Sequence, residues 1–300
     1  MKKICFVAAM LAAVVGCQKI DDDLVKELTE GSDVTEEGAT EIKTKKFTFT
    51  MKGDFTNEWK PVTRAYLSAD GKDLTDVWVL DYMNGELVQQ IHQGDNTAAD
   101  FGKPVMQLAY GEHHVYFIAS RGTGATLDTN AGTITFSRVL DTFWKDYEVS
   151  VVSTSNGNRA VTLDRVTTKL RLTFTDYLPA DAAVVKIAPH TWYYGLNYKT
   201  GVPCGVQTDP VTSIAIPESQ RGKTGVQVSL FGFSPSAEWT TDVTISSEKE
   251  DHTVLGTATL SGAPFKPNRV SDYSGPLFGS GGTITLSLDS EWEPYYEGTW

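Results

Sequence analysis

The chain is poor in cysteine. Its 300 residues include only Cys5, Cys17 and Cys204, and the first two lie in or beside an apolar N-terminal leader. If the leader is removed and Cys17 is modified, Cys204 is left alone and no disulfide can form within the chain. A domain without disulfides depends on its apolar core, and a hydrophobic content of 40% is sufficient for one. No His or Asp partner motif accompanies Cys204, so we expect a small buried side chain there, not a nucleophile.

Long apolar runs are also missing. Residues 4–15 form an apolar run of about a dozen residues, shorter than the ~20 residues that a membrane-spanning helix needs. Lys2 and Lys3 precede this run. A short positive segment followed by a short apolar core is typical of a secretory signal peptide, which we place at residues 1–16.

Clusters of basic residues are absent as well. The formal net charge is −12, and it becomes −14 once Lys2 and Lys3 leave with the leader. No run of Lys and Arg is interleaved with aromatic residues, so the sequence argues against a nucleic-acid partner. The acidity favours solubility and does not identify a substrate.

The sequence contains none of the common catalytic motifs. It has no G-x-S-x-G elbow, no Walker loop and no H-E-x-x-H pair. His113 and His114 are adjacent, so in a strand they point to opposite faces and cannot share a metal ion. We therefore predict that the protein is not an enzyme, with no catalytic residues, no metal and no cofactor. A pair of catalytic carboxylates is not excluded by counting, because Asp and Glu total 38.

A specific motif follows the apolar run. Val14-Val15-Gly16-Cys17 places small or apolar residues directly before a cysteine, which resembles the lipobox of bacterial lipoproteins. The resemblance implies cleavage between Gly16 and Cys17 and acylation of Cys17 by fatty-acid chains such as palmitate. Each buried CH₂ of such chains contributes about 0.8 kcal/mol to membrane attachment. The alternative is an ordinary secretory signal with an incidental cysteine.

Three acidic residues lie just after the proposed lipid site. Asp21, Asp22 and Asp23 resemble the export signal that sends Bacteroidetes lipoproteins to the cell surface, which implies a surface-exposed lipoprotein of the outer membrane. The alternative is that they are only part of a solvated tether. Residues 17–44 are rich in Asp, Glu, Thr and Gly, so we interpret them as a lipidated tether.

From residue 45 the apolar pattern has a period of two. Phe47, Phe49 and Met51 alternate with polar residues, as in a strand with one buried face. Further short strands are expected at 62–68, 76–82, 87–92, 104–109, 114–120, 133–137, 161–163, 166–175, 183–188, 192–197, 211–216, 226–234, 240–247, 254–261 and 283–288. Asn84-Gly85 is a strong hairpin-turn signal, because both residues tolerate positive φ.

This strand rhythm predicts an all-β protein of two sandwich domains. Asn156-Gly157-Asn158 is the strongest candidate boundary, which gives an N-terminal domain at residues 45–157 and a C-terminal domain at 158–300. One segment differs. Leu140, Phe143, Trp144 and Tyr147 follow the i, i+3, i+4, i+7 spacing of a helix, so we expect a short helix over the first sandwich.

Residues 159–177 resemble a known family. The pattern formed by Leu163, Arg165, Lys169 and Leu170 is similar to that of the fimbrillin-like (Mfa-like) proteins of Bacteroidales, which are subunits of type V pili. Matching stretches also occur at residues 63–65, 193–201 and 266–278, and the last is similar to the anchor-type subunits. The resemblance covers residues 45–290. The family commonly has Val-Ala-Lys where this chain has Val166-Thr167-Thr168-Lys169.

The resemblance implies a fold, a role and partners. The fold is two transthyretin-like Greek-key β-sandwich domains in tandem, and the role is that of an anchor or accessory subunit of a fimbria. Neighbouring subunits join by strand exchange, in which an extended segment of one chain completes a sheet of another. In polymerising members a protease removes the first strand after an Arg or Lys, for which Lys46 and Arg64 are the candidates here. The adhesion ligand on a host or bacterial surface stays open.

An alternative hypothesis, from a different functional class, is that the protein is a surface lipoprotein that binds glycans. Trp192, Tyr193, Tyr194 and Tyr198 are close in sequence, and aromatic rings stack on sugars. Of these, Tyr193 and Tyr198 are the candidates for a glycan platform. The competing interpretation places Trp192 and Tyr194 in the core, with Tyr193 partly exposed.

Mass spectrometry of the mature N-terminus, on protein from cells and from sheared pili, tests the lipoprotein assignment. We expect an acylated Cys17 in both samples. A start after a basic residue between Lys43 and Arg64 would instead show that the first strand is removed. An acylated Cys17 without any association with pili would favour the glycan-binding reading.

Overall fold

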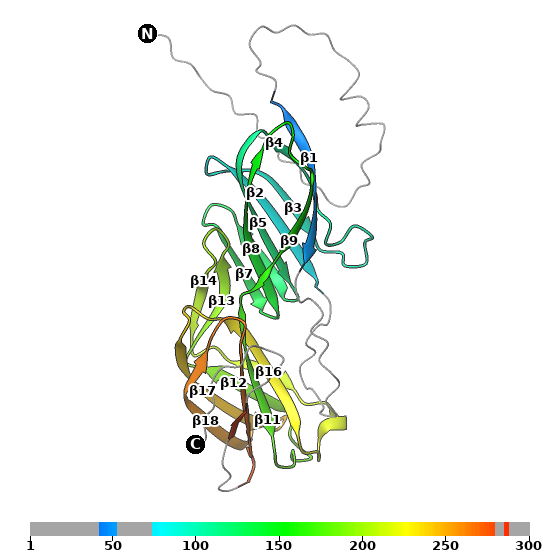
Figure 1. Cartoon of the computed structure of the whole chain (residues 1–300). Coiled ribbons are helices and arrows are strands. Elements are labelled where there is room, and N and C mark those ends of the chain that lie inside the picture. The colour runs from blue at the N-terminus through cyan, green and yellow to red at the C-terminus, as the bar shows by residue number, and fades with distance from the viewer. Residues whose placement is uncertain (1–41, 53–73, 280–284, 288–300) are drawn as a thin grey trace, which may run out of the picture. The chain divides into compact units, whose positions relative to one another are not determined.

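The structure is a computed structural model that describes residues 42–52, 74–279 and 285–287. These residues form β-strands together with one short 3₁₀ helix, Glu218–Gln220, and contain no α-helix (Figure 1). The expectation of an all-β fold is therefore confirmed. No helix among these residues is long and apolar enough to cross a membrane.

The first sandwich is built from two sheets. The smaller sheet has the order β4-β1-β9 and the larger has the order β10-β8-β5-β2-β3. The strands are β1 (Thr44–Lys52), β2 (Asp76–Met83), β3 (Glu86–Gln93), β4 (Val105–Ala109), β5 (Gly111–Ser120), β8 (Thr142–Val151), β9 (Asn158–Thr162) and β10 (Asp164–Arg165). The predicted hairpin turn joins β2 to β3, with positive φ at both Asn84 and Gly85.

The core of the first sandwich follows from alternation along these strands. Phe47, Phe49, Val79, Leu108 and Phe117 are completely buried and belong to one cluster between the two sheets. In β1 and β4 the neighbouring polar residues, such as Lys46 and Gln107, are exposed, as a period of two requires. In β2 and β5 the opposite face is apolar as well and packs into a further cluster described below.

The second sandwich contains an eight-stranded and a four-stranded sheet. The larger sheet has the order β20-β19-β11-β16-β13-β7-β6, with β14 paired to β13, and the smaller has the order β15-β12-β17-β18. The strands are β6 (Thr123–Asp128), β7 (Thr133–Arg138), β11 (Thr167–Phe174), β12 (Val184–Pro189), β13 (Thr191–Asn197), β14 (Val202–Thr208), β15 (Thr212–Ala215), β16 (Val226–Phe233), β17 (Trp239–Glu248), β18 (Val254–Phe265), β19 (Val270–Gly275) and β20 (Thr285–Ser287). Trp192, Val228, Val243 and Phe265 are completely buried in the core between these sheets.

Strands from both sides of the expected division at residues 157 and 158 share sheets. The hairpin β6–β7 precedes the division, yet β7 pairs with β13, and Leu196 lies opposite Ile134. In the other direction, β9 follows the division and pairs with β1. The described residues from Lys43 onward form one compact unit. The division into domains at residues 45–157 and 158–300 stays a prediction, since the strand pairings described here cross that division in both directions.

A third apolar cluster joins the larger sheet of the first sandwich to strands β7, β13 and β16. Leu80, Ile118, Ile134 and Leu196 are completely buried in it. Polar contacts accompany the packing: the hydroxyls of Tyr82 and Tyr198 lie 2.8 Å apart, and the Trp144 indole donates to the Tyr198 carbonyl at 2.8 Å.

The predicted short helix at residues 140–147 is wrong. These residues lead into strand β8, which pairs with β5 from Thr142 opposite Ser120 to Val151 opposite Gly111. Phe143 and Tyr147 face the first core, while Trp144 faces the third cluster. Side chains four residues apart share a face in a strand as well as in a helix, so this spacing did not distinguish the two.

A network of buried charged side chains around Asp141 connects the two sandwiches beside β10. The Asp141 carboxylate accepts hydrogen bonds from Arg165 Nε at 2.7 Å and from the Thr167 hydroxyl at 3.2 Å. Arg121 Nη1 lies 3.7 Å from the other carboxylate oxygen, and the side chains of Asp141 and Arg121 are both 4% exposed. Arg165 also donates to Asn268 at 3.2 Å, so one carboxylate organises groups that are far apart in the sequence.

The substitution Asp141→Ala is expected to lower the free energy of unfolding by about 3–5 kcal/mol, because it leaves buried cations without their carboxylate. Chemical denaturation measures the change. Asp164→Ala is the matched control. It removes the ion pair between Asp164 and Lys145, whose side chains are 63% and 39% exposed. This loss should lower the free energy of unfolding by less than about 1 kcal/mol. Equal losses in the two variants would contradict the structural role of Asp141.

Candidate strand-exchange site

Strand β1 follows the predicted tether and connects the two other strands of its sheet (Figure 1). It is antiparallel to β4, with Thr44 opposite Ala109 and Thr48 opposite Val105. It is parallel to β9, with Thr48 opposite Asn158 and onward to Lys52. Within the described residues, neither β4 nor β9 pairs with any other strand. This three-stranded sheet therefore exists only because β1 is present.

Two phenylalanines fix β1 in the core. Phe47 and Phe49 are each 0% exposed. The Phe49 ring meets Phe117 edge to face, with centroids 5.2 Å apart, and meets Tyr147 in the same way at 6.1 Å. The Arg159 guanidinium lies over the Phe47 ring, 5.5 Å from its centroid. β1 is therefore an extended segment that places two aromatic side chains, at i and i+2, in the core.

A glycine allows β1 and the start of β9 to lie close together. The Thr48 amide donates to the Gly157 carbonyl at 2.7 Å. A Cβ atom at residue 157 would lie 2.2 Å from the carbonyl oxygen of Lys46, which is too close for any side chain. The sequence indicated a turn at this glycine, but its close contact with β1 depends on a strand pairing that no local pattern reveals.

The two predicted processing residues differ in what a cut would remove. Lys46 is exposed within β1 and lies opposite Gln107. A cut after Lys46 would leave Phe47 and Phe49 on the main body, whereas a cut after Arg64 would remove all of β1. Arg64, Gly16, Cys17 and Asp21, Asp22 and Asp23 lie outside the described residues, so their predicted roles stay predictions.

The adjacent histidines lie on opposite faces of β5. His113 is buried, and its Nδ1 lies 2.8 Å from Asp81 while its Nε2 lies 2.9 Å from the Ala109 carbonyl. Burial raises the pKa of the Asp81 carboxyl, and the His113 hydrogen bond opposes that rise. This pair connects β2 and β5, and His113 also contacts the last residue of β4.

His114 lies on the other face with two carboxylates. Its Nδ1 is 3.2 Å from both carboxylate oxygens of Asp146. Together with Glu148, these side chains place one ligand atom each within 4.8 Å of one another, a spacing that could hold a metal ion. The sequence did not indicate this group, because only the register of β5 and β8 brings Glu148 opposite His114. All three side chains are at least partly exposed, and exposed groups of this kind are common without a metal.

The four aromatic residues at 192–198 do not form a surface platform. Trp192 is completely buried and donates to the Phe231 carbonyl at 2.9 Å. Tyr198 is 0% exposed, and burial together with the Tyr82 hydroxyl raises its pKa. Tyr193 is partly buried and meets Trp239 edge to face, 5.5 Å between centroids. Tyr198 therefore cannot contact a glycan on the surface, while Tyr194 lines a cavity.

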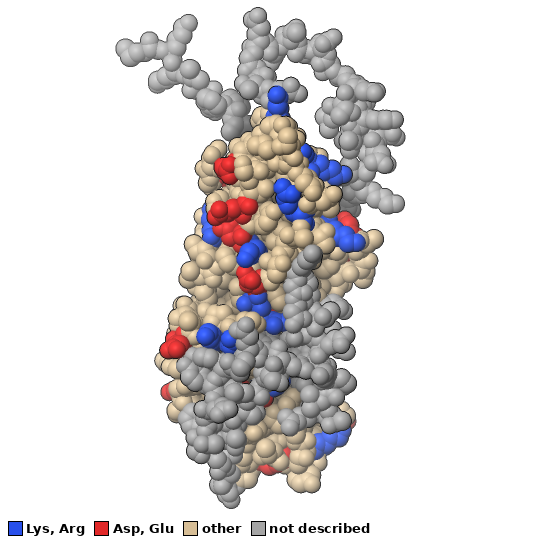
Figure 2. All heavy atoms as spheres, in the orientation of Figure 1, with Lys and Arg blue, Asp and Glu red and all other residues tan. Residues whose placement is uncertain are grey.

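Charges are mixed on the face of the molecule shown in Figure 2. Acidic and basic side chains are interspersed there, and the basic ones do not merge into one continuous surface. A nucleic acid requires a continuous basic surface, and the described residues visible in Figure 2 do not form one.

No family model matches the chain, and no curated protein matches it. Among solved structures, a fimbrial assembly protein from Parabacteroides distasonis is 10% identical, with 84% of this chain and 98% of that chain covered and a TM-score of 0.47. The fimbrial anchor protein Mfa2 from Porphyromonas gingivalis is 10% identical, with 85% and 100% covered and a TM-score of 0.44. The tip fimbrial protein Mfa3 from the same organism, with a C-terminal truncation, is 12% identical, with 81% and 99% covered and a TM-score of 0.43.

These neighbours carry the names of the family that the sequence resembles. Their TM-scores are all below one half, so they assign no function to this chain. Its function is inferred below from its own residues.

Replacing Phe49 with alanine is expected to lower the free energy of unfolding by about 3–5 kcal/mol, because it leaves a cavity between the two sheets. Thr50→Ala, at the exposed neighbouring position, should change it by no more than about 0.5 kcal/mol. Thermal or urea unfolding of both variants measures the difference. A small effect at Phe49 would mean that β1 does not contribute to the core.

Proposed function

We propose that this chain is a structural subunit of a type V fimbria on a bacterial surface, in an anchor or accessory position. Acylated Cys17 holds its base to the outer membrane, and strand exchange joins its body to neighbouring subunits. The observation that supports this best is the position of β1. It comes directly after the predicted tether, carries two fully buried aromatic side chains and, among the described strands, is the only one that pairs with β4 and β9.

The geometry describes what removal of β1 would do. It would leave unpaired main-chain groups on β4 and β9 and open the space that Phe47 and Phe49 fill. An extended segment of another subunit restores both, because main-chain hydrogen bonds supply affinity and two alternate side chains supply specificity. An unfilled groove of this kind promotes aggregation, so filling it is coupled to assembly.

The position in the fimbria depends on whether β1 is retained. A chain that keeps β1 has a complete first sandwich and keeps the tether that leads to its lipid, as an anchor does. A chain cut after Arg64 loses both and becomes an acceptor, as a shaft subunit does. The similarity of residues 266–278 to anchor-type subunits favours retention.

The alternative, a surface lipoprotein that binds glycans through Tyr193 and Tyr198, is not favoured by this geometry, because Tyr198 is fully buried. The protein has no catalytic role in this proposal.

A peptide-uptake experiment tests strand exchange. The mature chain is cut after Arg64 with an Arg-specific protease and is then incubated with a labelled peptide of residues 44–52. We expect native mass spectrometry to show a one-to-one complex after mild denaturant has released the original strand. A peptide with alanine in place of Phe47 and Phe49 should be taken up far less, because it cannot fill the core.

Equal uptake of both peptides, or uptake of neither by a chain that has released β1, would contradict strand exchange at this site. Uptake of the native peptide by an uncut chain would show that the groove is open without processing.

A further inference from the structure

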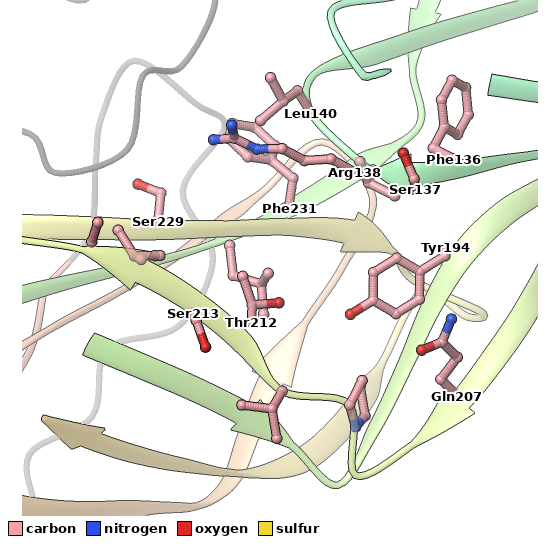
Figure 3. Close-up of a pocket in the computed structure, with 16 residues that line it drawn as sticks. Phe136, Ser137, Arg138, Leu140, Tyr194, Gln207, Thr212, Ser213, Ser229 and Phe231 are labelled. Carbon is pink, nitrogen blue, oxygen red and sulfur yellow. The ribbon is translucent and has the colours of Figure 1, made fainter. Parts of the chain in front are cut away.

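A cavity of about 690 Å³ opens beside the second sandwich, between β15, β16, the end of β7 and Tyr194 of β13 (Figure 3). Its size is within the range of roughly 300–1,000 Å³ that is typical of small-molecule sites. None of its walls comes from β1, so what it binds is independent of the proposed strand exchange.

One part of the cavity wall is aromatic and apolar. The Tyr194 ring is partly buried, and its hydroxyl is directed toward Thr212 (Figure 3). Burial raises the pKa of Tyr194, so the phenol is neutral at physiological pH. Phe136 and Phe231 add further apolar surface. Such a wall suits the apolar C–H face of a sugar ring, on which tyrosine commonly packs.

The polar groups on the wall are hydroxyls and an amide. Gln207 and Thr212 contribute side-chain donors and acceptors. Ser229 is 6% exposed, and its hydroxyl has no hydrogen-bond partner in the described part of the chain. A buried hydroxyl without a partner costs free energy. A ligand that hydrogen-bonds to Ser229 would recover this cost.

The described residues that line the cavity carry one positive charge, from Arg138. Among the described residues that line it, Arg138 is the only charged side chain, although the whole chain has a net charge of −12. Within the described residues, the Arg138 guanidinium makes no ion pair or side-chain hydrogen bond. Arg138 is an exposed residue at the edge of the cavity, and no carboxylate is among the described residues that line it. Its guanidinium can therefore pair with an anion, and its planar donors match a carboxylate.

We propose that this cavity binds an acidic sugar unit, one that carries a carboxylate. The carboxylate pairs with Arg138, the ring packs on Tyr194, and the sugar hydroxyls bond to Gln207, Thr212 and Ser229. This combination of one cation, an aromatic face and several neutral polar groups fits a carboxylated sugar better than a phosphate, which needs no apolar wall. β15 also lines the cavity and has one unpaired edge among the described strands, so an extended peptide is the competing ligand that the experiment must distinguish.

Saturation-transfer NMR on the mature full chain tests the proposal, with D-glucuronate, D-galacturonate and N-acetylneuraminate as probes. D-Glucose and inorganic phosphate serve as the comparison ligands. We expect at least one acidic sugar to bind, with D-glucose about tenfold weaker because it lacks the carboxylate. Arg138→Gln should weaken binding of the acidic sugar by about tenfold and leave glucose unchanged.

Two further variants separate a specific site from general charge effects. Tyr194→Ala should remove the ring contact and weaken acidic and neutral sugars alike. Lys103→Gln, which removes an exposed cation outside the cavity, should have no effect. Binding that is insensitive to Arg138→Gln, no binding of any acidic sugar, or full displacement of the sugar by equimolar phosphate would overturn the proposal. Binding of an extended peptide alone would assign the site to a protein partner instead.

Discussion

The first sandwich depends on the pairing of one strand. β4 and β9 are far apart in the sequence and have no mutual hydrogen bonds among the described residues, so β1 between them supplies the connection. The same strand brings Phe47 and Phe49 into the core, where Phe49 contacts Phe117 and Tyr147 of the opposite sheet. Main-chain pairing and apolar burial are therefore lost or restored together, and this makes β1 suitable for exchange between chains.

A second constraint is the junction between the sandwiches. Apolar side chains from both halves of the chain form one cluster there, and the Tyr82 and Tyr198 hydroxyls satisfy each other inside it. Next to it, Asp141 collects Arg121, Arg165 and Thr167. Buried charges of this kind are weak contributors to net stability but require a particular arrangement, because each unpaired member is costly. The junction therefore specifies geometry more than it adds stability.

Local patterns predicted much of this. Alternation of apolar residues identified most of the strands and the all-β class, and Asn84-Gly85 identified a hairpin, because these features depend on neighbouring residues alone. Pairing between distant strands could not be predicted. The parallel contact of β1 with β9, the position of β7 beside β13 and the approach of His114 to Glu148 all depend on register. The helix expected around Phe143 failed for a related reason, because the strand partner β5 decided the conformation. Tyr198 was selected for its residue type, but burial in the junction removed it from the surface.

The reciprocal crossing of strands also affects the order in which the chain can fold. β1 lies near the start of the described chain, but its parallel partner β9 starts at Asn158. In the same way, the hairpin β6–β7 can join its sheet only after β13 has been made. Contacts between residues so far apart in sequence form late, because closing a long loop must precede any gain from the contact. Until β9 has been made, β1 has an unpaired edge on the side where β9 will lie. During synthesis the first sandwich therefore stays incomplete until Asn158 and the residues after it are available to pair with β1.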